Sequence, residues 1–206
     1  MSDAATLEPI GKREKTKAAN RQAILDAARA VFAQLGYEAA TVRDIIRGTD
    51  LASGTFYNYF KSKEEVYEAL ADDGARRFRP ILRMSRENAK SFQDYLHSAF
   101  VAYFQFILAD NSGEGRPIDE RRPHVLRMDT PEMVAVYQEV RQSLEEAIAR
   151  GDAPHVDADY LACACIGMAQ EVGGEMLRRH PHDVDAAARF VTGLLLNGLP
   201  GAAKKS

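Results

Sequence analysis

The chain lacks the features that mark several common protein classes. Its 206 residues include no tryptophan and two cysteines, Cys163 and Cys165. Cysteines spaced i, i+2 would face away from each other on a helix, so they are expected to form neither a disulfide framework nor a metal pair nor a redox couple. No apolar run approaches the roughly 20 residues of a membrane-spanning helix, and the polar N-terminus lacks a signal-peptide core. The expectation is a cytoplasmic protein with no membrane partner.

Signals of catalysis are equally sparse. The sequence contains no phosphate-binding loop, no strand-based cofactor fingerprint and no nucleophile elbow. The run His180-Pro181-His182-Asp183 offers metal-ligand side chains, but histidines at the end of a helix are far commoner than a metal site there. We therefore expect no metal, no cofactor and no enzymatic activity.

The spacing of apolar residues predicts an all-α fold. A first helix ends at Gly36, and its apolar residues share one face at helical spacing: Ile24, Ala28, Val31, Phe32 and Leu35. Further helices are predicted from about Lys63 to Arg79, where Pro80 interrupts or restarts the helix, from Ser91 to Asp110, from Thr130-Pro131 to Gly151, from Asp157 to about His180 and from Asp183 to about Leu199, with a short helix within residues 118–128.

The formal charge of −3 is unevenly distributed. Residues 10–63 hold ten Lys/Arg and five Asp/Glu, an excess of five positive charges, so the remainder of the chain carries −8. A basic end joined to an acidic body is typical of a modular DNA-binding protein, although a solvated charged face gives the same count. Residues 1–17 are interpreted as a disordered basic arm, either a DNA contact or a solubilising tail.

Residues 41–63 carry the strongest functional signal, a predicted helix-turn-helix. Thr41 and Asp44 have the spacing of a capping box at the start of a helix. Residues 48–50, Gly-Thr-Asp, break the apolar pattern and tolerate turn geometry. In the helix that follows, Phe56 and Phe60 are spaced i, i+4 and can share the core-facing side. A helix-turn-helix commonly places its second helix in the DNA major groove.

The opposite face of that second helix is predicted to contact DNA. Gly54 in a helix costs about 1 kcal/mol relative to alanine, which favours close approach to a partner such as the sugar-phosphate backbone. Asn58 can pair with adenine, and the Thr55 methyl can touch a thymine methyl. The outward residues there are Ser53, Gly54, Thr55, Tyr57 and Asn58.

At these residues the chain resembles the TetR/AcrR family of repressors. The run Gly54-Thr55-Phe56-Tyr57-Asn58-Tyr59-Phe60-Lys61-Ser62-Lys63-Glu64-Glu65 is similar to the family signature, and Gly36-Tyr37 and Thr41-Val42-Arg43-Asp44-Ile45 fit upstream. Two positions depart from the pattern. Asp50 stands where glycine is usual, and Ala52 stands where serine or threonine caps the helix. The missing cap would weaken that helix by ~1 kcal/mol unless Ser53 or Asp50 substitutes.

The resemblance implies a domain plan and a function. It implies a helix-turn-helix DNA-binding domain at 18–64, a helical ligand-binding and dimerisation domain at 65–200 and a tail at 201–206. The expected function is a homodimeric repressor released from a palindromic double-stranded DNA operator by a small, mainly hydrophobic inducer. The alternative is a helical small-molecule binding protein or enzyme with a vestigial helix-turn-helix. The expected DNA contacts are Thr41, Ser53, Gly54, Thr55, Tyr57, Asn58, Tyr59 and Lys63.

Two further sites are expected in the second domain. Aromatic and methionine side chains suit an adaptable apolar ligand pocket, although ordinary core packing is the simpler reading of any one of them: Phe100, Tyr103, Phe104, Phe106, Met128, Met133, Tyr137 and Met168. Small and apolar residues on the last two helices favour a four-helix dimer interface, or else internal packing: Gly167, Gly174, Phe190, Val191, Leu194 and Leu195.

Overall fold

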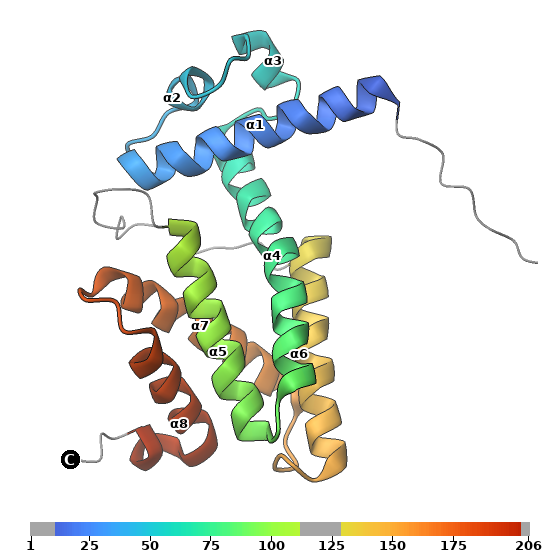
Figure 1. Cartoon of the computed structure of the whole chain (residues 1–206), viewed down its shortest axis with the longest axis vertical. Coiled ribbons are helices and arrows are strands. Elements are labelled where there is room, and N and C mark those ends of the chain that lie inside the picture. Colours follow the sequence, from blue (N-terminus) through green and yellow to red (C-terminus); the bar gives the residue numbers. More distant parts are fainter. Residues whose placement is uncertain (1–10, 112–128, 203–206) are drawn as a thin grey trace, which may run out of the picture. The chain divides into compact units, whose positions relative to one another are not determined.

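The structure is a computed structural model that describes residues 11–111 and 129–202. In these two ranges the chain is helical and contains no strand, which confirms the all-α prediction. Figure 1 shows the helices in chain order: α1 (Lys12–Leu35), α2 (Val42–Arg47), α3 (Ser53–Tyr57), α4 (Lys63–Asn88), α5 (Phe92–Asn111), α6 (Pro131–Arg150), α7 (Ala158–Arg178) and α8 (Val184–Ala202). None of these helices is long and apolar enough to cross a bilayer.

The chain divides into two compact units, Met1–Leu70 and Ala71–Ser206. The sequence placed the boundary after residue 64, but Val66 and Ala69 are buried in the N-terminal core, so the first turns of α4 belong to that unit. That core is formed where α1 packs on α2 and α3. Its most deeply buried side chains are Ile24, Leu25, Ile45, Phe56 and Val66.

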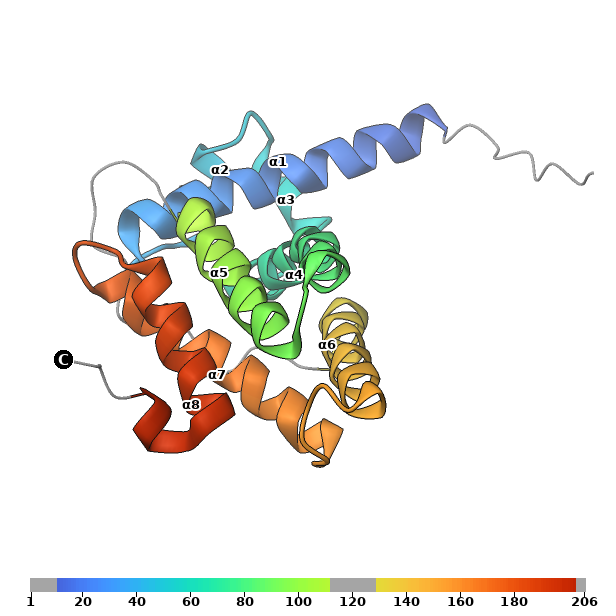
Figure 2. The same ribbon diagram turned by 60° about the horizontal axis from the view of Figure 1, so that its bottom comes forward.

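The C-terminal unit is a bundle in which α5 packs against α7 and α8, and α7 packs against α6. Figure 2 shows α5 between α8 and the second half of α4. Gly173 permits the close approach of α5 and α7, because a Cβ at this position would lie 2.7 Å from Ile107 Cδ1. The core is rich in rings, with Phe104 fully buried.

The predicted helix ends are formed by the expected caps. Thr41 and Asp44 make a complete capping box at α2, and Asp157 accepts backbone N–H bonds at the start of α7. Thr130 caps α6 with Pro131 in the first turn, where proline is tolerated. Gly151 ends α6 in the left-handed conformation, with φ of 78°. Because a side chain is strained at that φ, the glycine fixes this boundary.

Two boundaries of the longer helices differ from the prediction. α1 begins at Lys12, so residues 12–17 are helical rather than part of a disordered arm; they are rich in lysine, arginine and glutamate, which are good helix formers. α4 continues through Pro80 to Asn88. Proline removes one backbone bond, but Phe78 and Leu82 on either side of it are buried in the core. The expected short helix at 118–128 lies outside the described residues.

A buried carboxylate joins α4 to α6. Glu139 is 5% exposed, and its oxygens lie 2.8 Å from Arg83, 3.3 Å from Arg86 and 3.7 Å from Arg79. The hydrogen bond from Arg83 lowers the pKa of this carboxyl group, with the charges of the three arginines adding to the effect. A charged acceptor that is buried and fully paired in this way stabilises the packing of the two helices.

We predict that Glu139→Gln lowers the free energy of unfolding by about 2 kcal/mol at pH 7, because it removes a charged acceptor from three guanidinium groups. Since the folded-state pKa of Glu139 is lowered, its contribution is complete above the pKa of an unfolded glutamate, about 4.3. It is lost as the pH falls through the lower folded value.

Urea unfolding at pH 7 and pH 3 would measure this difference. The gap between the wild type and Glu139→Gln should narrow at the lower pH. Glu145→Gln, which breaks an exposed pair with Arg141, is the matched control and should change stability by less than about 0.5 kcal/mol. Equal effects of the two substitutions would contradict the role of the buried carboxylate.

Candidate DNA-binding interface

The helix-turn-helix is built by burying one side of α2 and α3. Ile45 of α2 is fully buried, and Phe56 of α3 is 1% exposed. Phe56 and Phe60 lie in contact, with ring centroids 6.1 Å apart. Gly48 ends α2 with an ordinary φ of −77°. Its lack of a side chain serves packing instead, because a Cβ there would approach the Ala27 Cβ to 3.1 Å.

The residues predicted to contact DNA lie on the outer side of α3. Tyr57 is 58% exposed; Ser53, Gly54 and Asn58 are exposed, whereas Thr55 and Tyr59 are half-buried. A Cβ added at Gly54 would meet nothing within 4 Å. No contact within the described residues therefore requires glycine at this position, which leaves room for close approach by an external partner.

The start of α3 has no side-chain cap. Ala52 occupies the N-cap position, and no side chain accepts a hydrogen bond there. Neither Ser53 nor Asp50 takes the missing role. The helix is also shorter than predicted, because regular α-helix ends at Tyr57. The burial of Phe56 is therefore what holds this segment in place.

Thr41 lies at the exposed start of α2, and its hydroxyl is committed to the capping box. Its Oγ1 accepts the Asp44 backbone N–H at 3.3 Å, and the Thr41 N–H donates to the Asp44 carboxylate at 3.0 Å. The Thr41 hydroxyl also donates to the Asp44 carboxylate at 2.5 Å, and this bond, together with the one from the Thr41 backbone N–H, lowers the pKa of Asp44. The role of Thr41 as a phosphate contact stays a prediction.

The structure corrects the role expected for Lys63. Its ammonium group donates to the carbonyl oxygens of Tyr37, Glu38 and Ala40 at 2.9, 3.2 and 3.2 Å. It also lies 4.6 Å from the centre of the Tyr37 ring. An ammonium group has three N–H donors, and here the loop between α1 and α2 takes all of them. Lys63 positions α2 within the unit and has no donor left for a phosphate.

We predict that Lys63→Met lowers the free energy of unfolding of the N-terminal unit by about 2 kcal/mol, because three carbonyl groups lose a charged donor. DNA affinity should fall while the slope of log affinity against log salt stays unchanged, since no phosphate contact is lost. Thermal melts and fluorescence polarisation at several salt concentrations measure the two quantities.

Lys61→Met is the control, because this neighbouring lysine is exposed and its loss should leave the melting temperature unchanged. A Lys63→Met variant of normal stability whose salt slope falls by about one would instead place the ammonium group on a phosphate.

Exposed arginines on α2 were missed as individual candidates by the sequence reasoning. Arg43 and Arg47 are both exposed, and Arg47 lies 3.8 Å from Asp44. The signal that could have identified them was the excess of positive charge in residues 10–63. Their side chains add to the basic character of the unit that carries α3.

The rings expected to line a ligand pocket pack in the core of the C-terminal unit. Phe100 and Phe104 are stacked with centroids 6.1 Å apart. Tyr103 and Phe106 both pack against Phe78, at 5.3 and 5.4 Å.

The remaining pocket candidates lie on α6 and α7. Met133 is buried, and Met168 packs half-buried against the core. The Tyr137 hydroxyl donates to Asp159 on α7 at 2.6 Å, and that bond raises its pKa to about 12. Met128 lies outside the described residues. A ligand pocket among these side chains stays a prediction.

The residues expected at a dimer interface separate into two groups. A Cβ at Gly167 would meet nothing within 4 Å, and one at Gly174 would meet only the end of the Arg178 side chain. Phe190 is 46% exposed, and Leu194 is half-buried. Val191 was assigned wrongly, because it is fully buried in the chain's own core.

Leu195 also packs, half-buried, against that core. The outward candidates on α7 and α8 are therefore Gly167, Gly174, Phe190 and Leu194.

These features define a class of protein, an all-α DNA-binding protein with an N-terminal helix-turn-helix. Residues 24–70 match the family model described as bacterial regulatory proteins, tetR family. The HTH-type transcriptional repressor AcnR of Corynebacterium glutamicum is 40% identical over 63 residues, 31% of this chain and 34% of AcnR. The repressor KstR2 of Mycobacterium tuberculosis is 26% identical over 149 residues, 68% of this chain and 73% of KstR2.

Solved structures extend the likeness to both units. The fatty acid degradation regulator FadR from Bacillus halodurans superimposes with a TM-score of 0.69 at 24% identity, covering 94% of this chain and all of FadR. FadR from Bacillus subtilis in complex with stearoyl-CoA gives 0.70 at 23% identity, covering 86% and 98%. At these identities the likeness shows the fold. The N-terminal unit therefore carries the DNA-binding domain of the TetR family of bacterial regulatory proteins.

We predict that Phe190→Glu splits a dimer formed through α7 and α8, because burying an unpaired carboxylate in an interface is costly. Sedimentation velocity should show a monomer with unchanged helical circular dichroism. Arg189→Glu, at the neighbouring exposed position, is the control for added negative charge. A Phe190→Glu protein that stays dimeric would place the interface elsewhere.

Proposed function

We propose that the protein is a transcriptional repressor that binds a palindromic DNA operator as a homodimer and leaves it when a small, mainly apolar molecule binds the C-terminal unit. The observation that carries the proposal is the two-sided character of α3. Phe56 is buried while Ser53, Gly54, Tyr57 and Asn58 are exposed beside it, so that polar groups able to contact base edges are held on a fixed element.

The relatives support repression rather than activation, since AcnR and KstR2 are both named as repressors. A dimer is supported by the small and apolar groups exposed on α7 and α8. Two linked helix-turn-helix units match two half-sites about one helical turn apart. Exposed phosphate-binding groups fix the register on DNA, whereas the face of α3 selects the sequence.

Release by a ligand requires unequal affinity for two states of the repressor. A ligand that binds the DNA-free state tenfold better shifts the balance by about 1.4 kcal/mol. The ring-rich core of the C-terminal unit supports an apolar ligand, because aromatic and methionine side chains adapt to such molecules. Compounds that raise the melting temperature of the full chain are therefore expected to lower its affinity for the operator.

Selection from a random DNA library tests the proposal. The wild type should enrich an inverted repeat, and Asn58→Ala should lose preference at one symmetric pair of positions, each worth about 1–3 kcal/mol. Asn88→Ala, at an exposed asparagine in the other unit, should enrich the wild-type sequence. A wild type that enriches no sequence would favour a helical binding protein whose helix-turn-helix is vestigial.

A further inference from the structure

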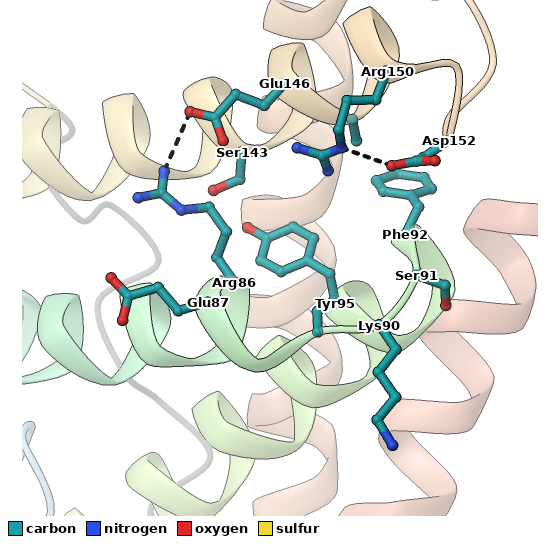
Figure 3. A pocket seen from close by; sticks show the side chains of 12 residues that line it. Arg86, Glu87, Lys90, Ser91, Phe92, Tyr95, Ser143, Glu146, Arg150 and Asp152 are labelled. Atoms are coloured by element: carbon teal, nitrogen blue, oxygen red, sulfur yellow. Dashed lines mark hydrogen bonds and ion pairs between the residues drawn. The ribbon is translucent and has the colours of Figure 1, made fainter.

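A polar pocket of about 360 Å³ lies in the C-terminal unit where α4 ends, α5 begins and α6 passes both (Figure 3). It shares no residue with the aromatic pocket expected from the sequence. Its volume falls within the usual range for small-molecule sites. Ala89, Phe92 and Ala147 give it an apolar wall, and the rest of its lining is largely charged or hydroxyl-bearing.

Arg86 brings a donor to this pocket that nothing in the described chain satisfies. Its Nη1 atom is buried and has no hydrogen-bond partner. The nearest carboxylate, Glu146, lies 3.8 Å away, which is beyond hydrogen-bond distance, and it accepts a bond from Gln142 at 2.9 Å. The other terminal nitrogen of Arg86 faces Glu139 at 3.3 Å. A buried charged donor in this state favours an incoming acceptor.

Arg150 and Tyr95 line the same space. Arg150 gives its Nε–H to Asp152 at 2.8 Å, which leaves the outer nitrogens of its guanidinium group for another acceptor. Figure 3 shows the guanidinium groups of Arg86 and Arg150 on either side of the Tyr95 and Ser143 hydroxyls. Burial raises the pKa of Tyr95 to about 12, and its hydroxyl forms a side-chain hydrogen bond with Ser143 at the edge of this space.

The charges of the lining limit the kind of anion that fits. The lining holds three cationic side chains, Arg86, Lys90 and Arg150, and three carboxylates, Glu87, Glu146 and Asp152. The lining is therefore neutral, and a ligand with several negative charges would be repelled by the carboxylates. A single planar carboxylate suits the paired geometry of guanidinium donors.

We propose that this pocket binds a small organic monocarboxylate, whose carboxylate lies between Arg86, Arg150 and the Tyr95 hydroxyl and whose apolar part lies against Phe92 and Ala147. Five parts of the fold contribute to the site: the end of α4, the turn that leads into α5, the first turns of α5, the last turns of α6 and the turn after α6. The site is independent of the proposed DNA binding and can be tested without DNA.

Calorimetric titration of the full chain with benzoate and hexanoate, each paired with its neutral amide, tests the proposal. At least one carboxylate should bind with a dissociation constant of about 1 mM or below, and its amide should bind at least about tenfold more weakly because it cannot accept charge-assisted bonds from two guanidinium groups. Equal affinities for acid and amide, or no binding of either acid, would overturn the proposal.

Substitutions locate the binding. Arg86→Met should weaken carboxylate binding about tenfold or more. Because Arg86 also pairs with Glu139, Arg150→Gln and Tyr95→Phe serve as second variants, one at an exposed helix end and one that keeps the buried ring; each should weaken binding several-fold. Arg178→Gln, at an exposed arginine of α7 paired with Glu175, should bind as the wild type does. Undiminished binding by both Arg150→Gln and Tyr95→Phe would exclude this pocket.

Discussion

The burial of Phe56 is the contact on which the proposed DNA-binding face depends. α3 spans Ser53–Tyr57 and has no side-chain cap, and a helix this short is unstable by itself in water. It is held because Phe56 and Phe60 close the core formed by Ile24, Leu25 and Ile45. With that side fixed inward, Ser53, Gly54 and Asn58 must face outward, because successive residues of a helix point in different directions.

Besides apolar burial, charged side chains hold segments of the protein together through contacts within the chain. Lys63 ties the loop between α1 and α2 through three carbonyl groups, and Glu139 ties α6 to three arginines of α4. In each case a charge loses water and gains several directional partners. A basic residue in a DNA-binding unit therefore need not contact a phosphate. Likewise, an arginine-rich helix need not bind an external anion.

The C-terminal unit separates apolar packing from polar recognition. The rings of α5 stack on one another and on Phe78 in the core. The polar pocket lies at the start of the same helix, where Tyr95 meets Ser143 and two arginines. On α8 two neighbouring apolar residues differ in exposure, since Phe190 is 46% exposed and Val191 is fully buried.

The sequence by itself determined the helices, most of their ends and the likeness of residues 24–70 to the TetR family. Thr41 with Asp44, Thr130 with Pro131, Asp157 and Gly151 act through neighbours a few residues away, so their effect is visible in the order of residues. Tertiary structure alone decided which side chains were free for function. The bonds of Lys63 span 23 to 26 residues, and Val191 is buried by other helices. Pro80 lies inside α4 between buried core residues. The pocket at Arg86 is formed by residues of α4, α5 and α6. Such contacts join residues distant in the chain, and neither periodicity nor motif spacing records them.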